Sequence, residues 1–318
     1  MLRKFAYNKI FRTTGMLLLF LLLLLFPASK EYSLEDDITV KTSSNLKKNE
    51  VFLIDKNGYV ARCKVLISGN TNEDYATKLV ELLIIDGKYQ EKIPNGFRAI
   101  LPTDVKINDV SINGDSITID LSKEFYELSS PDVQRAIEAL TFNLTSINGI
   151  TNLYIKIDGS LLKTFDKTGK NFVQPFTRKS GVNKTYDVTN YKDASSVTVY
   201  YVSKSNNGYY YVPVTKITND NRDKIKIIID ELTCSHIYET NLMSFLNYNT
   251  KLLNYELTDD VLTLNFNNFL FDDENSKSIL EEVIYSISLS VRDNYDVKEV
   301  IFTVDGKEIT KSVIKNIE

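Results

Sequence analysis

The chain has 318 residues, 43% of them hydrophobic, which is enough to build two domains with separate cores. Its 38 basic and 42 acidic residues give a net charge of −4, so no excess of positive charge favours binding to nucleic acid. The chain contains one histidine, His236, and two cysteines, Cys63 and Cys234. These counts disfavour most triad hydrolases and metalloenzymes, and we expect no catalytic residues, no cofactor and no metal site.

The histidine and the cysteines have simple structural interpretations. His236 follows the expected end of a helix, where its positive form is favoured without any catalytic role. Cys63 and Cys234 occupy unrelated places and form neither a CxxC motif nor a metal-ligand spacing. We interpret both thiols as small apolar residues, with a disulfide between them as the alternative.

The first 29 residues predict a signal anchor. Four basic residues among the first 12 precede a continuous apolar run over residues 16–26. Because basic residues before an apolar run stay in the cytoplasm, we expect the rest of the chain to be extracytoplasmic. The small-x-small cleavage pattern is missing, so we expect residues 13–28 to stay in the membrane as a single-pass helix. Cleavage would instead release a secreted protein.

After a tether over residues 30–49, the first half of the chain predicts a hairpin, a helix, a second hairpin, a second helix and a last strand. Each helix carries apolar residues at the spacing of one buried face. The last strand ends at Asp158-Gly159, which predicts a turn. In chain order the ranges are 51–54 and 59–67, 76–83, 105–112 and 117–121, 130–144, and 153–157.

The second half repeats this pattern. Phe302–Gly306 corresponds to Ile155–Gly159 at a distance of 147 residues, and the apolar face of the preceding helix recurs at the same distance. We therefore predict two copies of one domain, at residues 50–162 and 195–312, joined by a polar linker over residues 163–194.

Each copy has the order ββαββαβ. Half-buried strands and two amphipathic helices predict an α+β fold, in which a single, mainly antiparallel sheet carries both helices on one face. The apolar residues Phe172, Val173 and Phe176 of the linker are expected to dock on a domain surface.

Several segments resemble the GerMN domain family of sporulation and spore germination proteins. They are the strand Val197–Tyr201, the helix end Asp230-Glu231-Leu232, the strand Ile117–Ser122 and the terminal Asp-Gly of each copy. The resemblance implies exported, membrane-tethered tandem modules without known catalytic residues, with a fold similar to ring-building motifs. It also implies a part in envelope assembly during spore formation, in particular at the channel between mother cell and forespore.

Paired carboxylates would be the first sign of a hydrolase, and only Asp158 and Asp305 recur in both copies. Each precedes a glycine at a strand end, so we interpret both as turn residues. Asp120 corresponds to Asn265 in the second copy, and a catalytic acid would not survive that exchange.

Tyrosines are concentrated in the first hairpin of the second copy, and alternation places aromatics on both of its faces. Because tyrosine is favoured at interfaces, we predict this hairpin as the interaction surface, although β propensity alone is the alternative explanation. The five residues are Tyr200, Tyr201, Tyr209, Tyr210 and Tyr211.

Together these observations favour a non-catalytic module that supports assembly of a sporulation or germination envelope complex through protein contacts. The partners would be envelope or sporulation proteins, with contact to the cell wall in addition. The alternative is a secreted domain that binds or hydrolyses wall glycan.

Overall fold

A computed structural model describes residues 48–165, 167, 169–205, 208–234, 241–273, 275 and 277–313. The predicted anchor, almost all of the tether, and His236 lie outside these ranges. None of the helices described combines the length and apolar character needed to span a bilayer.

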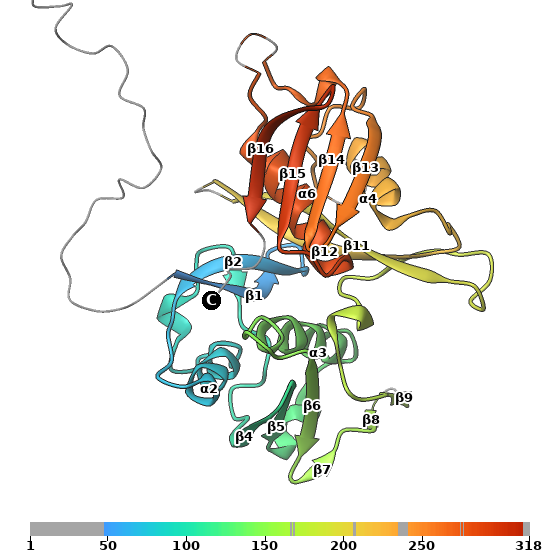
Figure 1. The fold of residues 1–318 in the computed structure, drawn as a ribbon. Helices are drawn as coiled ribbons and strands as arrows, with labels where there is room; N and C mark the ends of the chain where they lie inside the picture. Colours follow the sequence, from blue (N-terminus) through green and yellow to red (C-terminus); the bar gives the residue numbers. More distant parts are fainter. Residues whose placement is uncertain are drawn as a thin grey trace, which may run out of the picture. The chain divides into compact units, whose positions relative to one another are not determined.

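The first copy follows the predicted order of elements with small additions (Figure 1). Its first hairpin and first helix lead through a short 3-10 helix and strand into the second hairpin, the second helix and the closing strands. The bounds are β1 (Lys48–Asp55), β2 (Val60–Leu66), α2 (Asn72–Leu82), η1 (Gln90–Lys92), β3 (Phe97–Arg98), β4 (Ile107–Asn113), β5 (Ser116–Leu121), η2 (Lys123–Glu127), α3 (Ser130–Leu144), β6 (Asn152–Ile157) and β7 (Ser160–Leu161).

The second copy has the same succession of hairpin, helix, hairpin, helix and closing strands. Its bounds are β11 (Ser195–Ser205), β12 (Gly208–Thr218), α4 (Lys224–Thr233), β13 (Leu252–Thr258), β14 (Val261–Phe266), η4 (Asn268–Leu270), α6 (Glu281–Asn294), β15 (Glu299–Val304) and β16 (Lys307–Val313). Even an irregularity recurs, because β4 is bulged between Ile107 and Asp109 and β13 is bulged between Leu252 and Asn254.

Each copy forms a four-stranded sheet, in the orders β4-β5-β6-β7 and β13-β14-β15-β16. The outer pairs are antiparallel and the central pairs, β5 with β6 and β14 with β15, are parallel. The prediction of a single sheet per copy is wrong, because the first hairpin of each copy belongs to a different sheet. Those hairpins share one six-stranded sheet with the order β10-β12-β2-β1-β3, in which β10 is the short strand Thr185–Asp187 and β11 pairs with β12.

The second helix explains why the hairpin lies in a separate sheet. α3 lies between the β1–β2 hairpin and the sheet that contains β5 and β6 (Figure 1). Every residue of α3 from Ile137 to Leu144 is buried, including the polar ones. Because the hairpin covers one side of α3 and the four-stranded sheet covers the opposite side, the hairpin is not part of that sheet.

Buried amide and hydroxyl groups hold each hairpin on its helix. The Asn143 side chain accepts a hydrogen bond from the Phe52 N–H at 2.9 Å and donates one to the Phe52 carbonyl at 2.7 Å. In the second copy, the Ser290 hydroxyl accepts from the Tyr200 N–H at 2.9 Å. These bonds satisfy backbone groups that would otherwise be buried without partners.

The Asp-Gly pairs form turns as predicted, but the chain continues into a further strand after each. Both residues of each pair have positive φ, 45° and 80° at Asp158 and Gly159, and 49° and 77° at Asp305 and Gly306. Two consecutive positive values are typical of the tight hairpin turn in which Asp-Gly is preferred. The turns therefore lead into β7 and β16, which the predicted order lacked.

The segment between the copies is structured over most of its length. It contains β8 (Thr164–Phe165), β9 (Lys170–Asn171), η3 (Arg178–Ser180) and β10 (Thr185–Asp187). Phe176 exchanges backbone hydrogen bonds with Leu153 on β6 and is buried, whereas Val173 is 87% exposed. The expected docking of this segment on the first copy is therefore confirmed for Phe176 and wrong for Val173.

Candidate interaction site at the junction of the two copies

The five predicted tyrosines do not form one exposed surface. Tyr200 and Tyr210 are 0% and 7% exposed, and Tyr201 and Tyr211 are half-buried. Tyr209, at 46%, is the exposed member and packs edge-on against Phe245. Four of the five tyrosines of the predicted interaction surface are therefore buried or half-buried, and Tyr209 is the one that remains exposed.

Tyr210 makes a direct bond between the copies. Its hydroxyl donates to Oδ2 of Asp55 at 2.8 Å and accepts from the Ser203 hydroxyl at 3.0 Å. Its ring packs edge-on against Phe97, with ring centroids 4.9 Å apart. Burial raises the pKa of Tyr210 to about 12, so the phenol stays a donor at physiological pH.

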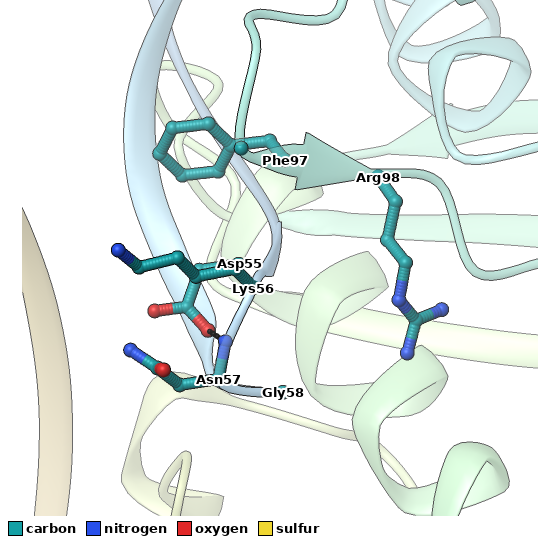
Figure 2. A pocket seen from close by; sticks show the side chains of 7 residues that line it. Asp55, Lys56, Asn57, Gly58, Phe97 and Arg98 are labelled. Atoms are coloured by element: carbon teal, nitrogen blue, oxygen red, sulfur yellow. Dashed lines mark hydrogen bonds between the residues drawn. The ribbon is translucent and has the colours of Figure 1, made fainter. Parts of the chain in front are cut away.

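Asp55 is positioned for this bond by its own turn. The carboxylate is 1% exposed, and its Oδ1 accepts from the N–H groups of Asn57 at 2.9 Å and Tyr59 at 2.8 Å. Figure 2 shows this turn with Phe97 nearby, at the edge of a cavity of about 460 Å³. One oxygen therefore organises the β1–β2 turn while the other binds the second copy.

Asp293, near the end of α6, is a second meeting point. Its side chain is 2% exposed and accepts from the Tyr200 hydroxyl at 2.6 Å and from Nη1 of Arg178 at 2.9 Å. Burial, followed by the charge of Asp293, raises the pKa of Tyr200 to about 12. A buried carboxylate is tolerated here because it is paired and hydrogen-bonded.

Arg178 carries this network into the first copy. Its Nη2 donates to the Phe142 carbonyl at 3.1 Å and to the Ser146 hydroxyl at 2.8 Å. The guanidinium also stacks on the Phe142 ring, 4.6 Å from the centroid. One side chain of the connecting segment therefore contacts both copies.

A third contact forms across the shared sheet, where Tyr211 faces Arg62 in register. The Arg62 guanidinium lies 5.8 Å from the centroid of the Tyr211 ring and forms an ion pair with Glu50. Arg292 of α6 also pairs with Glu50, at 3.4 Å. Burial and the nearby charge of Arg292 lower the pKa of Arg62 to about 10, and Arg62 still remains protonated at neutral pH.

Asn183 hydrogen-bonds to strands of both copies. Its side chain accepts from the Val60 N–H at 3.0 Å, and its Nδ2 donates to the carbonyls of Val60 at 2.8 Å and Pro213 at 2.7 Å. Its own N–H donates to the buried carboxylate of Glu138 at 3.0 Å. The strands β2 and β12 are paired at a single position, Arg62 with Tyr211. Asn183 therefore supplies hydrogen bonds to backbone groups of both strands that the sheet pairing leaves without partners.

Tyr201 acts within the second copy. Its hydroxyl donates to Oε2 of Glu231 at 2.9 Å, and Lys216 pairs with the other oxygen of that carboxylate at 2.7 Å. Burial and the Glu231 charge raise the pKa of Tyr201. Of the five tyrosines, Tyr200, Tyr210 and Tyr211 therefore contribute to the junction.

The recurring aspartates do not meet in a cleft. Asp158 accepts from the Asn108 amide at 3.3 Å within its own copy. The Gly159 N–H donates to Asp120 at 3.0 Å, and the Gly306 N–H donates to Asn265 at 2.9 Å. The role of Asp120 and of the corresponding Asn265 requires only an acceptor oxygen for the glycine N–H. This explains why aspartate occurs in one copy and asparagine in the other.

The cysteines are unpaired, with Cys63 buried and Cys234 exposed. Burial raises the pKa of the Cys63 thiol to about 12, which disfavours the reactive thiolate. Across the described part of the chain, no three His, Cys, Asp or Glu side chains converge as metal ligands.

Comparison with known proteins agrees with the tandem architecture. The chain matches the family described as Germane, sporulation and spore germination, at residues 50–163 and 198–310. It is 34% identical to the spore germination protein GerM of Bacillus subtilis (strain 168) over 288 residues, covering 88% of this chain and 78% of GerM.

A solved structure provides the corresponding comparison of the fold. The tandem GerMN domains of the sporulation protein GerM from Bacillus subtilis match with a TM-score of 0.74 and 33% identity, covering 82% of this chain and 92% of that structure. The chain therefore belongs to the Germane family of sporulation and spore germination proteins and carries its GerMN domains in tandem.

Proposed function

We propose that this protein is a non-catalytic, extracytoplasmic module that supports assembly of a sporulation or germination envelope complex through protein contacts. Membership of the Germane family supports the cellular process. The mechanism rests on the junction, where polar side chains are used to join the copies. Two domains joined by buried polar contacts are suited to hold partners at a fixed distance.

The observation that carries this proposal is how the buried ionisable groups are used. Asp55, Asp293 and Arg178 each form hydrogen bonds with two or more partners within the fold. The bonds of Asp55 are 2.8–2.9 Å long, and those of Asp293 and Arg178 are 2.6–3.1 Å long. A general acid or base must instead keep a reacting atom available to the substrate, whereas both carboxylate oxygens of Asp55 and of Asp293 are already hydrogen-bonded within the fold. These groups therefore favour a structural role over a catalytic one.

Residues 13–28 are proposed to hold the module at the outer face of the membrane. The basic flank and the missing cleavage pattern support a retained segment. N-terminal sequencing of the mature protein tests this proposal. A sequence that begins at Ser29 or Lys30 would show that the segment is removed.

Capture from the membrane fraction of sporulating cells tests the partner contacts. Tyr209 is the exposed residue of the tyrosine hairpin, and Tyr209→Ser should reduce the recovery of envelope proteins without lowering stability. Tyr191→Ser, at a tyrosine that is 76% exposed in the connecting segment, is the matched control. Equal recovery with both variants would remove the hairpin from the proposed surface.

The same capture and a sporulation assay with Asp158→Asn/Asp305→Asn test the rival mechanism. Our proposal predicts a folded protein with normal function, since these residues serve turns. A folded but inactive variant would point to an acid-dependent activity and contradict the non-catalytic proposal.

A further inference from the structure

A groove with both polar and apolar surface, of about 1260 Å³, lies where the two copies and the connecting segment meet. Its walls come from the start of α2, the turn between α3 and β6, the η3 segment and the end of α6. The volume exceeds the roughly 300–1,000 Å³ of pockets that enclose single small ligands. The groove therefore has room for a ligand larger than a single compact small molecule.

The charged groups of the groove largely neutralise one another. Arg292 pairs with Glu50, and Arg178 pairs with Asp293. A strongly charged ligand would have to compete with these pairs, because their charges are already compensated. The groove therefore favours a ligand without net charge.

Most hydroxyl and amide groups of the walls are committed to the fold. Ser146 donates to the Phe142 carbonyl at 2.6 Å, and Thr151 and Asn152 bind the Asp115 carboxylate at 3.0 Å. By contrast, three exposed side chains have no partner within the described part of the chain: Asn72, Asn148 and Lys179. They come from α2, the α3–β6 turn and η3, so donors and acceptors face the groove from three segments.

Two half-buried tyrosines add flat surfaces. Tyr75 lies in the first turn of α2, and Tyr295 follows α6. Tyr295 is held in place because its hydroxyl accepts from the Ile225 N–H at 2.8 Å. The apolar side chains of the walls, Ile147 and Ile150, are only 4% and 5% exposed. They therefore do not form an apolar pocket that could hold an anchor side chain of a partner protein.

We propose that this groove binds a neutral glycan chain. A pyranose ring has an apolar C–H face that packs on a tyrosine ring, and a rim of hydroxyl and acetamido groups that bind amides and ammonium groups. The site goes beyond the protein contacts proposed above. Since both copies and the connecting segment contribute walls, the closed junction is part of the site.

Calorimetric titration of the full chain tests this proposal, in a zwitterionic detergent that contains no sugar. The probe is the uncharged hexamer of β-1,4-linked N-acetylglucosamine. We expect saturable binding with one site per chain. In the triple variant Asn72→Ala/Asn148→Ala/Lys179→Ala, we expect affinity to fall by about tenfold or more, since three hydrogen bonds are lost.

The matched control is Asn113→Ala/Asn254→Ala/Lys307→Ala, which changes exposed residues of the same types outside the groove. The affinity of this control for the hexamer should lie within about twofold of that of the unchanged protein, because the three residues do not line the groove. Absence of saturable binding by the unchanged protein would overturn the proposal. Equal affinities in the two triple variants would also overturn it, and neither result depends on the capture of envelope proteins.

Discussion

The phenol of Tyr210 in the second copy donates a 2.8 Å hydrogen bond to the carboxylate of Asp55 in the first. This bond explains an asymmetry between the repeats. The first hairpin of the second copy carries five tyrosines between positions 200 and 211, whereas Tyr59 is the one tyrosine of the corresponding hairpin. The tyrosines of the second copy occupy a junction between domains, so the two hairpins meet different packing requirements.

Tyr210→Phe should destabilise the protein by about 1–3 kcal/mol, because Oδ2 of the buried Asp55 loses its donor. Chemical denaturation measures the change in the free energy of unfolding. Tyr209→Phe is the matched control, since it removes the hydroxyl of the exposed neighbour and should change stability by less than about 0.5 kcal/mol. Equal effects of the two substitutions would contradict the role assigned to the Tyr210–Asp55 bond.

Arg178→Ala should be more harmful, with a loss of about 3–5 kcal/mol, because it removes the ion-pair partner of a carboxylate that is 2% exposed. Lys179→Ala, at the exposed next residue, provides the control and should be nearly neutral. Thermal unfolding of both variants measures the difference. A stable Arg178→Ala protein would mean that Asp293 is sufficiently compensated by its other partners.

Position 120 should accept asparagine but not alanine. Asp120→Asn keeps an acceptor for the Gly159 N–H, as Asn265 does for Gly306, whereas Asp120→Ala removes it at a cost of about 1 kcal/mol. Denaturation midpoints of the two variants provide the comparison. If both substitutions had the same effect, charge at position 120, and not the hydrogen bond, would be the important property.

Glu138 should make the junction less stable as the pH rises. Burial raises the pKa of its carboxyl above the ordinary value of 4.5, and bonds from Asn183 and Gln134 oppose this shift only in part. The folded protein therefore binds this proton more tightly than the unfolded chain, so stability falls as the pH rises from about 4.5 through the folded pKa.

Glu138→Gln removes this titration, so it should flatten the fall in stability with rising pH that begins near pH 4.5. Denaturation at several pH values, for the variant and the unchanged protein, is the measurement. A profile of the same slope in both would show that Glu138 does not contribute.

Local patterns in the sequence predicted local structure well. The i, i+3, i+4, i+7 spacing predicted the helices, and Asp-Gly predicted turns whose residues have positive φ at Asp158 and Asp305. Placement of the first hairpin failed because it depends on burial of α3 on two sides. The buried Ala139 and Phe142 indicated this second contact, since they widen the apolar face of the helix beyond a single stripe.

The junction was harder to predict because its partners are distant in the chain. Tyr200 and Asp293 are 93 residues apart, and Tyr210 and Asp55 are 155 residues apart. Arg178 and Asn183 lie in a polar segment without periodicity, and their types alone do not distinguish them from linker residues. The concentration of tyrosines did indicate an interface, but the sequence offers no means of deciding that it lies within the chain.

The position of Tyr200 also sets an order of events during synthesis. Tyr200 and Leu289 pack into the hydrophobic core that is otherwise built from the first copy and the connecting segment. Because the N-terminal copy is synthesised and exported first, its core lacks these two side chains until the second copy follows. The core of the first copy is therefore incomplete until α6 of the second copy is available. Closure of the junction is thus a late step in the maturation of the chain.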